Sequence, residues 1–144
     1  MTAFTFDNVT EGAELPEFAL PLTIQRLVME AAANRDFAPI HHDREITRAT
    51  GAPEPYANTM LTQAVFEATL REWMGLAGRL RSLRFKMRSF AAAGSILSGH
   101  GRVTGKRADD GGGFVDVEVW TASGGMQTAT GTATIWLPDG GFEP

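Results

Sequence analysis

The spacing of apolar residues changes once along this chain, after Gly78. Before that point the longest regular run, NTMLTQAVFEATLREWMGLAG, carries apolar side chains around most of a helical circumference, which is typical of a buried helix. After it, apolar and polar residues alternate, as they do in half-buried strands. One buried helix followed by a series of strands predicts an α+β fold, in which a curved antiparallel sheet wraps around a long central helix.

Two shorter helices and a loop are expected before the long helix. The stretch LTIQRLVMEAAANR repeats apolar residues at the spacing of one helical face, namely Ile24, Leu27, Val28 and Ala31. Thr23 is a suitable N-cap for that helix. The stretch DREITRATG predicts a short helix ending at Gly51, and the two prolines of APEPYAN predict a loop. Asn58 or Thr59 is the expected cap of the long helix.

Four strands are expected in the second half of the chain. They are LRFKMRSF, SILSGHGRVTG, FVDVEVW and QTATGTATIWL, with KRADDGGG and SGG as turns. The first of them separates an apolar face from a basic face that carries Arg84, Lys86 and Arg88. A short extended piece near the N-terminus, EFALPLTI, is interrupted by Pro21 and would complete the sheet as an edge strand.

The composition favours one soluble domain spanning residues 1–144. The 144 residues are 43% hydrophobic, enough for a single core, and residues 1–16 are polar and expected to be loosely ordered. The absence of cysteine excludes disulfides and thiolate chemistry. A net charge of −4 argues against nucleic acid as the main partner. With neither a signal peptide nor a membrane span in the sequence, a cytoplasmic location is expected.

Two of the three histidines and two aspartates gather in NRDFAPIHHDRE. A metal site has little support there, because the side chains of the adjacent His41 and His42 diverge and His100 lies far along the chain. A solvated polar loop remains an alternative. A third interpretation is a general acid–base pair, in which the turn at Pro39 directs Asp36 and His41 into one cleft around a water molecule.

The segment RDFAPIHHD resembles the signature of the MaoC-like, or (R)-specific, enoyl-CoA hydratases, which has the form D-x-N-P-x-H. This sequence matches it at Asp36, Pro39, Ile40 and His41. The surrounding order of elements also matches over residues 17–137, and the fold that the resemblance implies is the hot-dog fold. Ala38 stands where the signature has asparagine, and Thr59 stands where the family has a glycine at the start of its central helix.

The resemblance implies reversible hydration of a trans-2-enoyl-CoA to a (3R)-3-hydroxyacyl-CoA. Asp36 and His41 would be the catalytic pair and would titrate as a unit. Asn58 and Thr59 would form the oxyanion and substrate-binding position, although both are also ordinary N-cap residues. Outside the pair, His42 would point away, and Asp43 would cap the helix that follows it. No metal and no cofactor are implied, since the CoA thioester is the substrate.

The basic strand face allows two interpretations. Arg84, Lys86 and Arg88 are either the solvated side of an amphipathic strand or a groove for the phosphates of CoA. Two further functions remain open. A hot-dog thioesterase would need a carboxylate near the start of the central helix, whereas Glu67 and Glu72 lie further along it. A non-catalytic acyl-CoA-binding subunit would be expected to lack the Asp/His pair.

A narrower resemblance is to the small MaoC-like subunit of the actinobacterial steroid side-chain enoyl-CoA hydratase. It rests on RDF…HHDR, on Asn58 at the start of the central helix and on Trp73 near its end. It implies a bulky or steroid-like acyl group. It also implies assembly as a homodimer or as a heteromer with a second hot-dog subunit.

Overall fold

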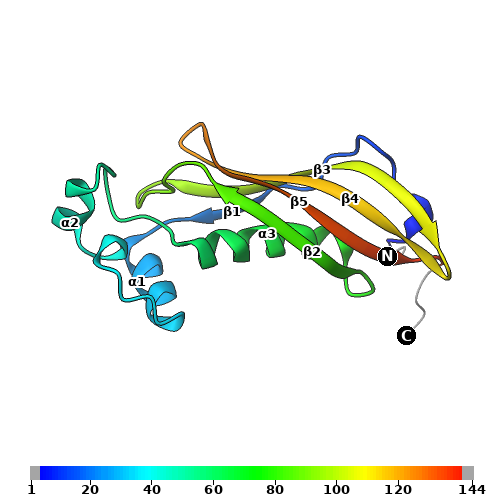
Figure 1. Cartoon of the computed structure of the whole chain (residues 1–144), viewed down its shortest axis with the longest axis horizontal. Helices are drawn as coiled ribbons and strands as arrows, with labels where there is room; N and C mark the ends of the chain where they lie inside the picture. Colours follow the sequence, from blue (N-terminus) through cyan, green and yellow to red (C-terminus); the bar gives the residue numbers. More distant parts are fainter. Residues whose placement is uncertain (1–3, 141–144) are drawn as a thin grey trace.

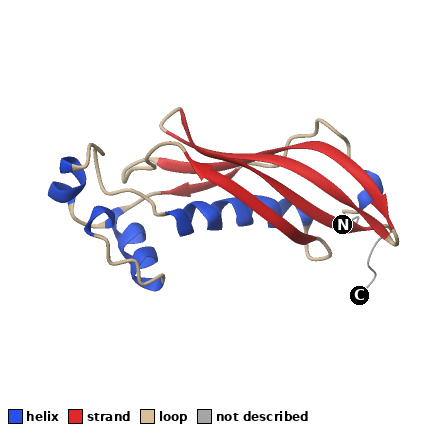
Figure 2. Ribbon diagram, viewed as in Figure 1, coloured by secondary structure: helices blue, strands red, loops and turns tan. Residues whose placement is uncertain are grey.

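The computed structural model describes residues 4–140 and consists of one sheet with a long helix against one face (Figures 1 and 2). The helical elements are η1 (Phe6–Asn8), α1 (Ile24–Ala33), η2 (Pro39–His41), α2 (Arg44–Ala49) and α3 (Thr59–Met74). The strands are β1 (Phe18–Pro21), β2 (Arg79–Met87), β3 (Ile96–Asp109), β4 (Gly112–Ser123) and β5 (Met126–Pro138).

The five strands form a single antiparallel sheet in the order β1-β3-β4-β5-β2. Val117 in the central strand β4 pairs with Val103 on one side and with Ala133 on the other, and all three are buried. These inward residues alternate with polar ones, as the period of two predicts. The α+β class and the curved sheet around a long helix are confirmed, and β1 occupies the predicted edge position.

Helix α3 lies along one face of the sheet and carries the largest share of the helical core. Phe66 and Leu70 are fully buried against the strands. Gly99 on β3 permits this close approach, because a Cβ atom there would overlap Thr69 Oγ1. The helix is less buried than its composition predicts, since Met60 and Ala64 are exposed on the side that the sheet leaves uncovered. Within residues 4–140, no helix is long and apolar enough to cross a membrane.

The hairpin between β3 and β4 corrects the prediction that KRADDGGG is a turn. Strand β3 continues to Asp109 and β4 begins at Gly112, so only Asp110 and Gly111 turn the chain. Gly111 has φ +71°, which suits glycine in a tight hairpin. The polar residues of this stretch resemble a loop in sequence because the end of the hairpin extends beyond the core.

The N-terminal segment corrects a second expectation, that residues 1–16 are loosely ordered. From residue 4 onward the segment packs on the sheet, and Phe6, Val9 and Leu15 are buried in the core. Lys106 Nζ on β3 donates to the carbonyl oxygens of Phe6 and Val9 at 3.0 and 3.1 Å. Residues 1–3 lie outside the described residues.

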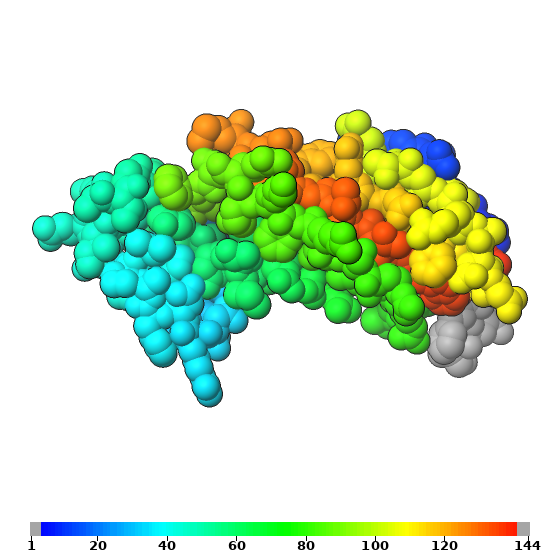
Figure 3. Space-filling view, in the orientation of Figure 1, coloured from blue at the N-terminus to red at the C-terminus, as the bar shows by residue number. Residues whose placement is uncertain are grey.

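Helices α1 and α2 lie beyond one end of the sheet, next to the start of α3 (Figures 1 and 2). In the space-filling view they form a lobe at that end of the molecule (Figure 3). The loop with the clustered histidines joins these two helices. It is therefore brought to the N-terminal end of α3.

Candidate active site

The chain turns sharply between α1 and α2. Arg35 adopts φ 57°, the left-handed conformation, immediately after α1. The N–H of Asp36 then donates to Ala31 O at 2.8 Å, which holds the start of the loop against the helix end. Pro39 opens the short 3₁₀ turn η2 that ends at His41. This path brings Asp36 Oδ2 to 3.1 Å from His41 Nε2.

The Asp36 carboxylate is held from two sides. Asn58 Nδ2 donates to Oδ2 at 3.0 Å, and the backbone N–H of Ala38 donates weakly to Oδ1 at 3.4 Å. The hydrogen bond from Asn58, more than any other contact, lowers the pKa of Asp36, and the bond from Ala38 and the proximity of His41 act in the same direction against desolvation. Asp36 is therefore ionised at neutral pH, with 36% of its side chain open to solvent.

His41 is fixed by its other ring nitrogen. Nδ1 lies 2.7 Å from the carbonyl oxygen of Tyr56, which can only accept, so Nδ1 carries a hydrogen. The ring also packs edge-on against the Tyr56 ring at 5.6 Å between centroids. Only 6% of the His41 side chain is exposed. Nε2 is consequently the ring nitrogen that faces Asp36.

The distance between Asp36 Oδ2 and His41 Nε2 allows a direct hydrogen bond. Two atoms 3.1 Å apart form a hydrogen bond only when a proton lies between them. The two groups are therefore placed to share one proton. No water fits between the two side chains at this distance, so a bound water would contact both from the pocket side.

A pocket of about 460 Å³ opens at this pair. Its lining comes from the η2 turn, the start of α3 and the segment after β2, namely Asp36, Ile40, His41, Tyr56, Ala57, Asn58, Thr59, Met87, Arg88, Ser89 and Phe90. The structure thus brings together all four residues that the sequence placed in the catalytic and oxyanion positions. Most of the surface of the pocket wall is apolar.

Thr59 and Asn58 contribute to the pocket in different ways. Thr59 is the first residue of α3 and lines the pocket, at the helix end where backbone N–H groups point outward and the dipole is positive. Asn58 is the N-cap, and its Oδ1 accepts from Leu61 N at 2.9 Å. Its Nδ2 donates to Asp36 Oδ2, so the Asn58 side chain joins the start of α3 to the loop that carries Asp36.

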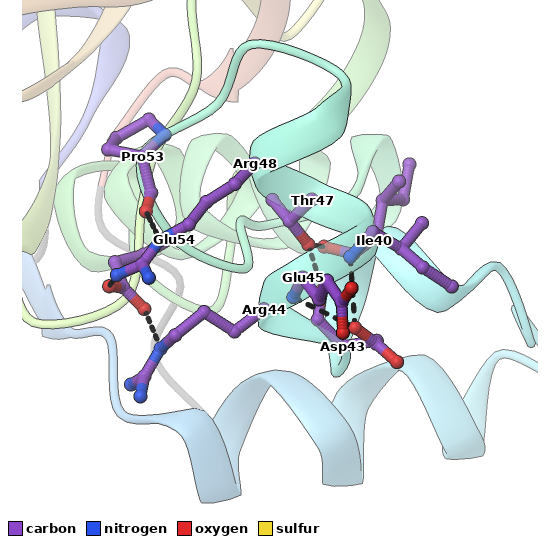
Figure 4. A network of polar contacts seen from close by, with 9 residues as sticks. Ile40, Asp43, Arg44, Glu45, Thr47, Arg48, Pro53 and Glu54 are labelled. Carbon is purple, nitrogen blue, oxygen red and sulfur yellow. Dashed lines mark hydrogen bonds and ion pairs between the residues drawn. The ribbon is translucent and has the colours of Figure 1, made fainter.

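The predicted roles of His42 and Asp43 agree with their surroundings, which Figure 4 shows for Asp43. His42 is exposed and turned away from the pocket. Asp43 caps α2, and its Oδ1 accepts from the N–H groups of Glu45 and Ile46 at 2.9 and 3.0 Å. The buried Thr47 donates to Ile40 O at 3.0 Å. The short helix therefore anchors the far end of the η2 turn.

Glu54 ties α2 to the loop that leads to Tyr56 (Figure 4). Arg44 Nε and Arg48 Nη2 donate to its carboxylate at 2.6 and 2.8 Å. The hydrogen bond from Arg44, followed by that from Arg48, lowers the pKa of Glu54. These exposed ion pairs hold the loop on which the carbonyl oxygen of Tyr56 reaches His41.

The basic row on β2 divides in the structure. Arg84 and Lys86 are exposed on the sheet face opposite the core-packed Leu83 and Phe85. Arg88 lies just past the end of β2, where it lines the pocket, and its Nε donates to Thr130 Oγ1 at 3.0 Å. Of the three, only Arg88 reaches the pocket, and binding of CoA phosphates by this row stays a prediction.

Three residues near the site had no signal in the sequence. Tyr56 holds His41 through its backbone, which no side-chain motif reveals. Phe90 stacks at a tilt on the Tyr56 ring at 4.7 Å and lines the pocket. Glu30 on α1 lies near Asn58, Asp36 and His41, and burial raises the pKa of its carboxyl. Glu30 belongs to no motif in the sequence, so nothing there indicated this position.

His100 takes no part in this site. On β3 its Nε2 lies 2.8 Å from Ser98 Oγ and its ring stacks on Trp120. Among the residues that the structure describes, no three His, Asp or Glu side chains gather closely enough to hold a metal ion.

Comparison with known proteins gives one curated relative and many similar structures. No family model matches the chain. The 3-oxo-4,17-pregnadiene-20-carboxyl-CoA hydratase beta subunit of Mycobacterium tuberculosis is 29% identical over 76 residues, which cover 53% of this chain and 59% of that protein. The match thus spans less than two thirds of the relative.

The structural likenesses cover nearly the whole chain. The ChsH1–ChsH2 complex from Mycobacterium tuberculosis contains a chain with TM-score 0.79 and 25% identity, over 90% of this chain and 98% of that one. A MaoC-like dehydratase gives TM-score 0.81 and 26% identity, over 93% of this chain and 42% of that one. Each likeness covers at least 90% of this chain.

Proposed function

Because this chain is a MaoC-like protein with the hot-dog fold, we propose that it catalyses the reversible hydration of a trans-2-enoyl-CoA to a (3R)-3-hydroxyacyl-CoA. One observation carries the proposal: Asp36 Oδ2 lies 3.1 Å from His41 Nε2 beside a pocket at the N-terminus of α3. Two coupled proton-exchanging groups next to a positive helix end are the parts that addition of water to a conjugated thioester needs.

The reaction adds the elements of one water molecule across the double bond. A water held by the Asp36 carboxylate and by His41 Nε2 loses a proton to the pair as its oxygen bonds to C3. The π electrons shift toward the thioester carbonyl, and a proton from the pair then reaches C2. The pair ends in its starting protonation state, so it acts as a single acid–base unit.

The backbone N–H of Thr59 is the proposed donor to the thioester oxygen. At the first position of α3 this N–H has no acceptor within the helix, and the positive dipole end favours the negative charge that develops on the oxygen. One well-aimed donor contributes about 3 kcal/mol to stabilising such a transition state. Thr59 lines the pocket beside the pair, which supports this role.

The proposed substrate is a CoA thioester with a bulky, steroid-like acyl group. The relative from Mycobacterium tuberculosis is named for hydration of a pregnadiene carboxyl-CoA, which supports the choice. The largely apolar pocket, with Met87 and Phe90 in its wall, suits an apolar acyl chain. Arg88 is the proposed contact for the anionic part of CoA, because a guanidinium pairs well with phosphate.

A second hot-dog chain is the proposed partner, either a copy of this protein or a different subunit. The curated relative is a beta subunit, and the ChsH1–ChsH2 structure is a complex of two proteins. Neither a thioesterase nor a non-catalytic subunit has comparable support. Glu67 contacts Gln63 and Arg71 along α3 and does not line the pocket, and the acid–base pair is intact.

The proposal is tested by offering the purified protein crotonyl-CoA and a steroid-side-chain enoyl-CoA. Loss of the conjugated enoyl absorbance, with a (3R)-3-hydroxyacyl-CoA found by chiral chromatography, is the expected result. A thiol reagent added in parallel measures free CoA. Release of CoA with no hydroxyacyl product would identify a thioesterase and overturn the proposal.

A further inference from the structure

We propose that Asn58 is a positioning residue, which holds the Asp36 carboxylate against His41 through its side-chain N–H while its oxygen caps α3. This role differs from the oxyanion or substrate contact expected from the sequence. The inference rests on the proposed function for its effect on catalysis. The geometry of the three side chains is independent of any substrate.

The orientation of the Asn58 amide follows from its two contacts. The N–H of Leu61, in the first turn of α3, needs an acceptor and finds Asn58 Oδ1 at 2.9 Å. The amide nitrogen must therefore face the other way, where Asp36 Oδ2 lies at 3.0 Å. A flipped amide would set an N–H against an N–H and an oxygen against a carboxylate. Asn58 is buried, so water does not replace either contact readily.

The same Asp36 oxygen receives both Asn58 Nδ2 and His41 Nε2. Oδ2 is consequently fixed between a neutral donor from α3 and the imidazole from η2. Oδ1 has only the weak 3.4 Å contact with the N–H of Ala38, so it is the oxygen left for a bound water. Asn58 thereby determines which carboxylate oxygen contacts His41 and which is open to the pocket.

The charged and titratable groups around Asp36 come from every neighbouring element. His41 comes from η2, Glu30 from α1, and Arg88 and Tyr56 from the pocket wall. Glu30 lies near the amide of Asn58 and also accepts from Asn34. The charge of Asp36 is one of the influences that raise the pKa of Glu30. At Asp36 itself, the Asn58 N–H lowers the pKa more than any other contact and acts against desolvation, which raises it.

Two substitutions separate positioning from capping. Asn58→Ser retains a good N-cap oxygen for Leu61 but has no amide to reach Asp36. Asn58→Asp keeps both the cap and the shape of asparagine, yet it replaces the donor with a carboxyl beside Asp36 and Glu30. If Asn58 only caps the helix, Asn58→Ser should behave like the unchanged protein, because Ser and Asn cap about equally well.

The experiment measures three quantities for the unchanged protein and both variants: thermal stability, the pH profile of enoyl-CoA hydration, and the titration of Asp36 by carboxyl NMR, assigned with Asp36→Asn. Positioning predicts similar melting temperatures and a kcat lowered about tenfold to a hundredfold, the equivalent of one lost bond to a charged group. It also predicts a higher pKa for Asp36, which moves the acid limb of the profile to higher pH.

Unchanged kcat and unchanged titration in two folded variants would overturn the proposal. So would an equal loss of stability and activity with no change in the pH profile, since that pattern belongs to a structural cap. If the unchanged protein shows no hydration, only the proposed function is wrong, and the role of Asn58 is still open. The titration of Asp36 then still decides whether Asn58 controls the carboxylate.

Discussion

His41 Nδ1 lies 2.7 Å from the carbonyl oxygen of Tyr56, and this contact joins two loops that are separated by α2. One loop carries the acid–base pair and the other leads into α3. The contact fixes the tautomer of the imidazole, so Nε2 faces Asp36. The position of His41 therefore also depends on α2. Arg44 and Arg48 of that helix bind Glu54, which lies shortly before Tyr56 in the sequence.

His41→Asn should lower kcat by about 10²- to 10⁴-fold, the usual effect of losing a general acid or base. The asparagine amide can donate to Tyr56 O as Nδ1 does, but it has nothing in the place of Nε2. The matched control is His42→Asn, because His42 is adjacent in sequence, exposed and outside the pocket. Steady-state hydration rates check both variants. Equal losses in the two variants would contradict the assignment of His41.

Arg88→Ala should raise KM for an enoyl-CoA several-fold and leave KM for the matching enoyl-pantetheine thioester unchanged. The reason is that Arg88 lines the pocket, where it would pair with a phosphate that pantetheine lacks. Arg84→Ala is the control, because Arg84 is an exposed residue of β2 outside the pocket. If Arg84→Ala and Arg88→Ala raise KM equally, the whole basic row binds CoA. If neither does, the phosphates bind elsewhere.

Gly99→Ala should destabilise the fold by roughly 1–3 kcal/mol, because its methyl group would overlap Thr69 and Val65 on α3. Gly105→Ala is the matched control on the same strand, since a Cβ there meets nothing within 4 Å. Its effect should stay within about 0.5 kcal/mol. Denaturant unfolding of both variants measures the difference. Equal stabilities would mean that α3 does not approach β3 closely at Gly99.

The helices and strands were predictable because each is indicated by apolar residues and caps within its own stretch of sequence. The alternation from Leu83 onward and in FVDVEVW predicted strands, and the N-caps at Thr23 and Asp43 were predicted from residue type. The packing of Phe6 and Val9 was missed, because their neighbours in sequence are polar and their partners on the sheet lie far along the chain. The true length of β3 was missed for a similar reason, since its end is polar and pairs beyond the core.

The candidate site was predicted in part. The motif around Pro39 indicated Asp36 and His41, and the structure brings them within 3.1 Å. The sequence also placed Asn58 beside the site, and its oxyanion or substrate-binding role stays a prediction. Its amide turns toward Asp36 because Leu61 requires its oxygen, a constraint visible only in three dimensions. The signature asparagine is Ala38 here, and the amide that reaches Asp36 comes instead from the cap of α3.

The protein should associate with a second hot-dog chain through the site end of the molecule. Phe37, Met60 and Phe90 are exposed apolar side chains near or within the pocket, and Phe37 is 74% exposed. Light scattering should give at least twice the chain mass of 15.5 kDa, alone or with a partner subunit. Phe37→Asp should weaken that association, whereas Leu76→Asp, fully exposed just after α3, should not. A monomer under all conditions would contradict this prediction.

The central claim is that Asp36 and His41 together add water to an enoyl-CoA. The most direct measurement is the hydration rate of the unchanged protein and of Asp36→Asn, each tested alone and with a hot-dog partner subunit. Asparagine keeps the shape of Asp36 but cannot take or give the proton. The account predicts hydration by the unchanged protein and a loss of about 10²-fold or more in Asp36→Asn, with the fold intact by circular dichroism. Hydration by Asp36→Asn at the rate of the unchanged protein would contradict it.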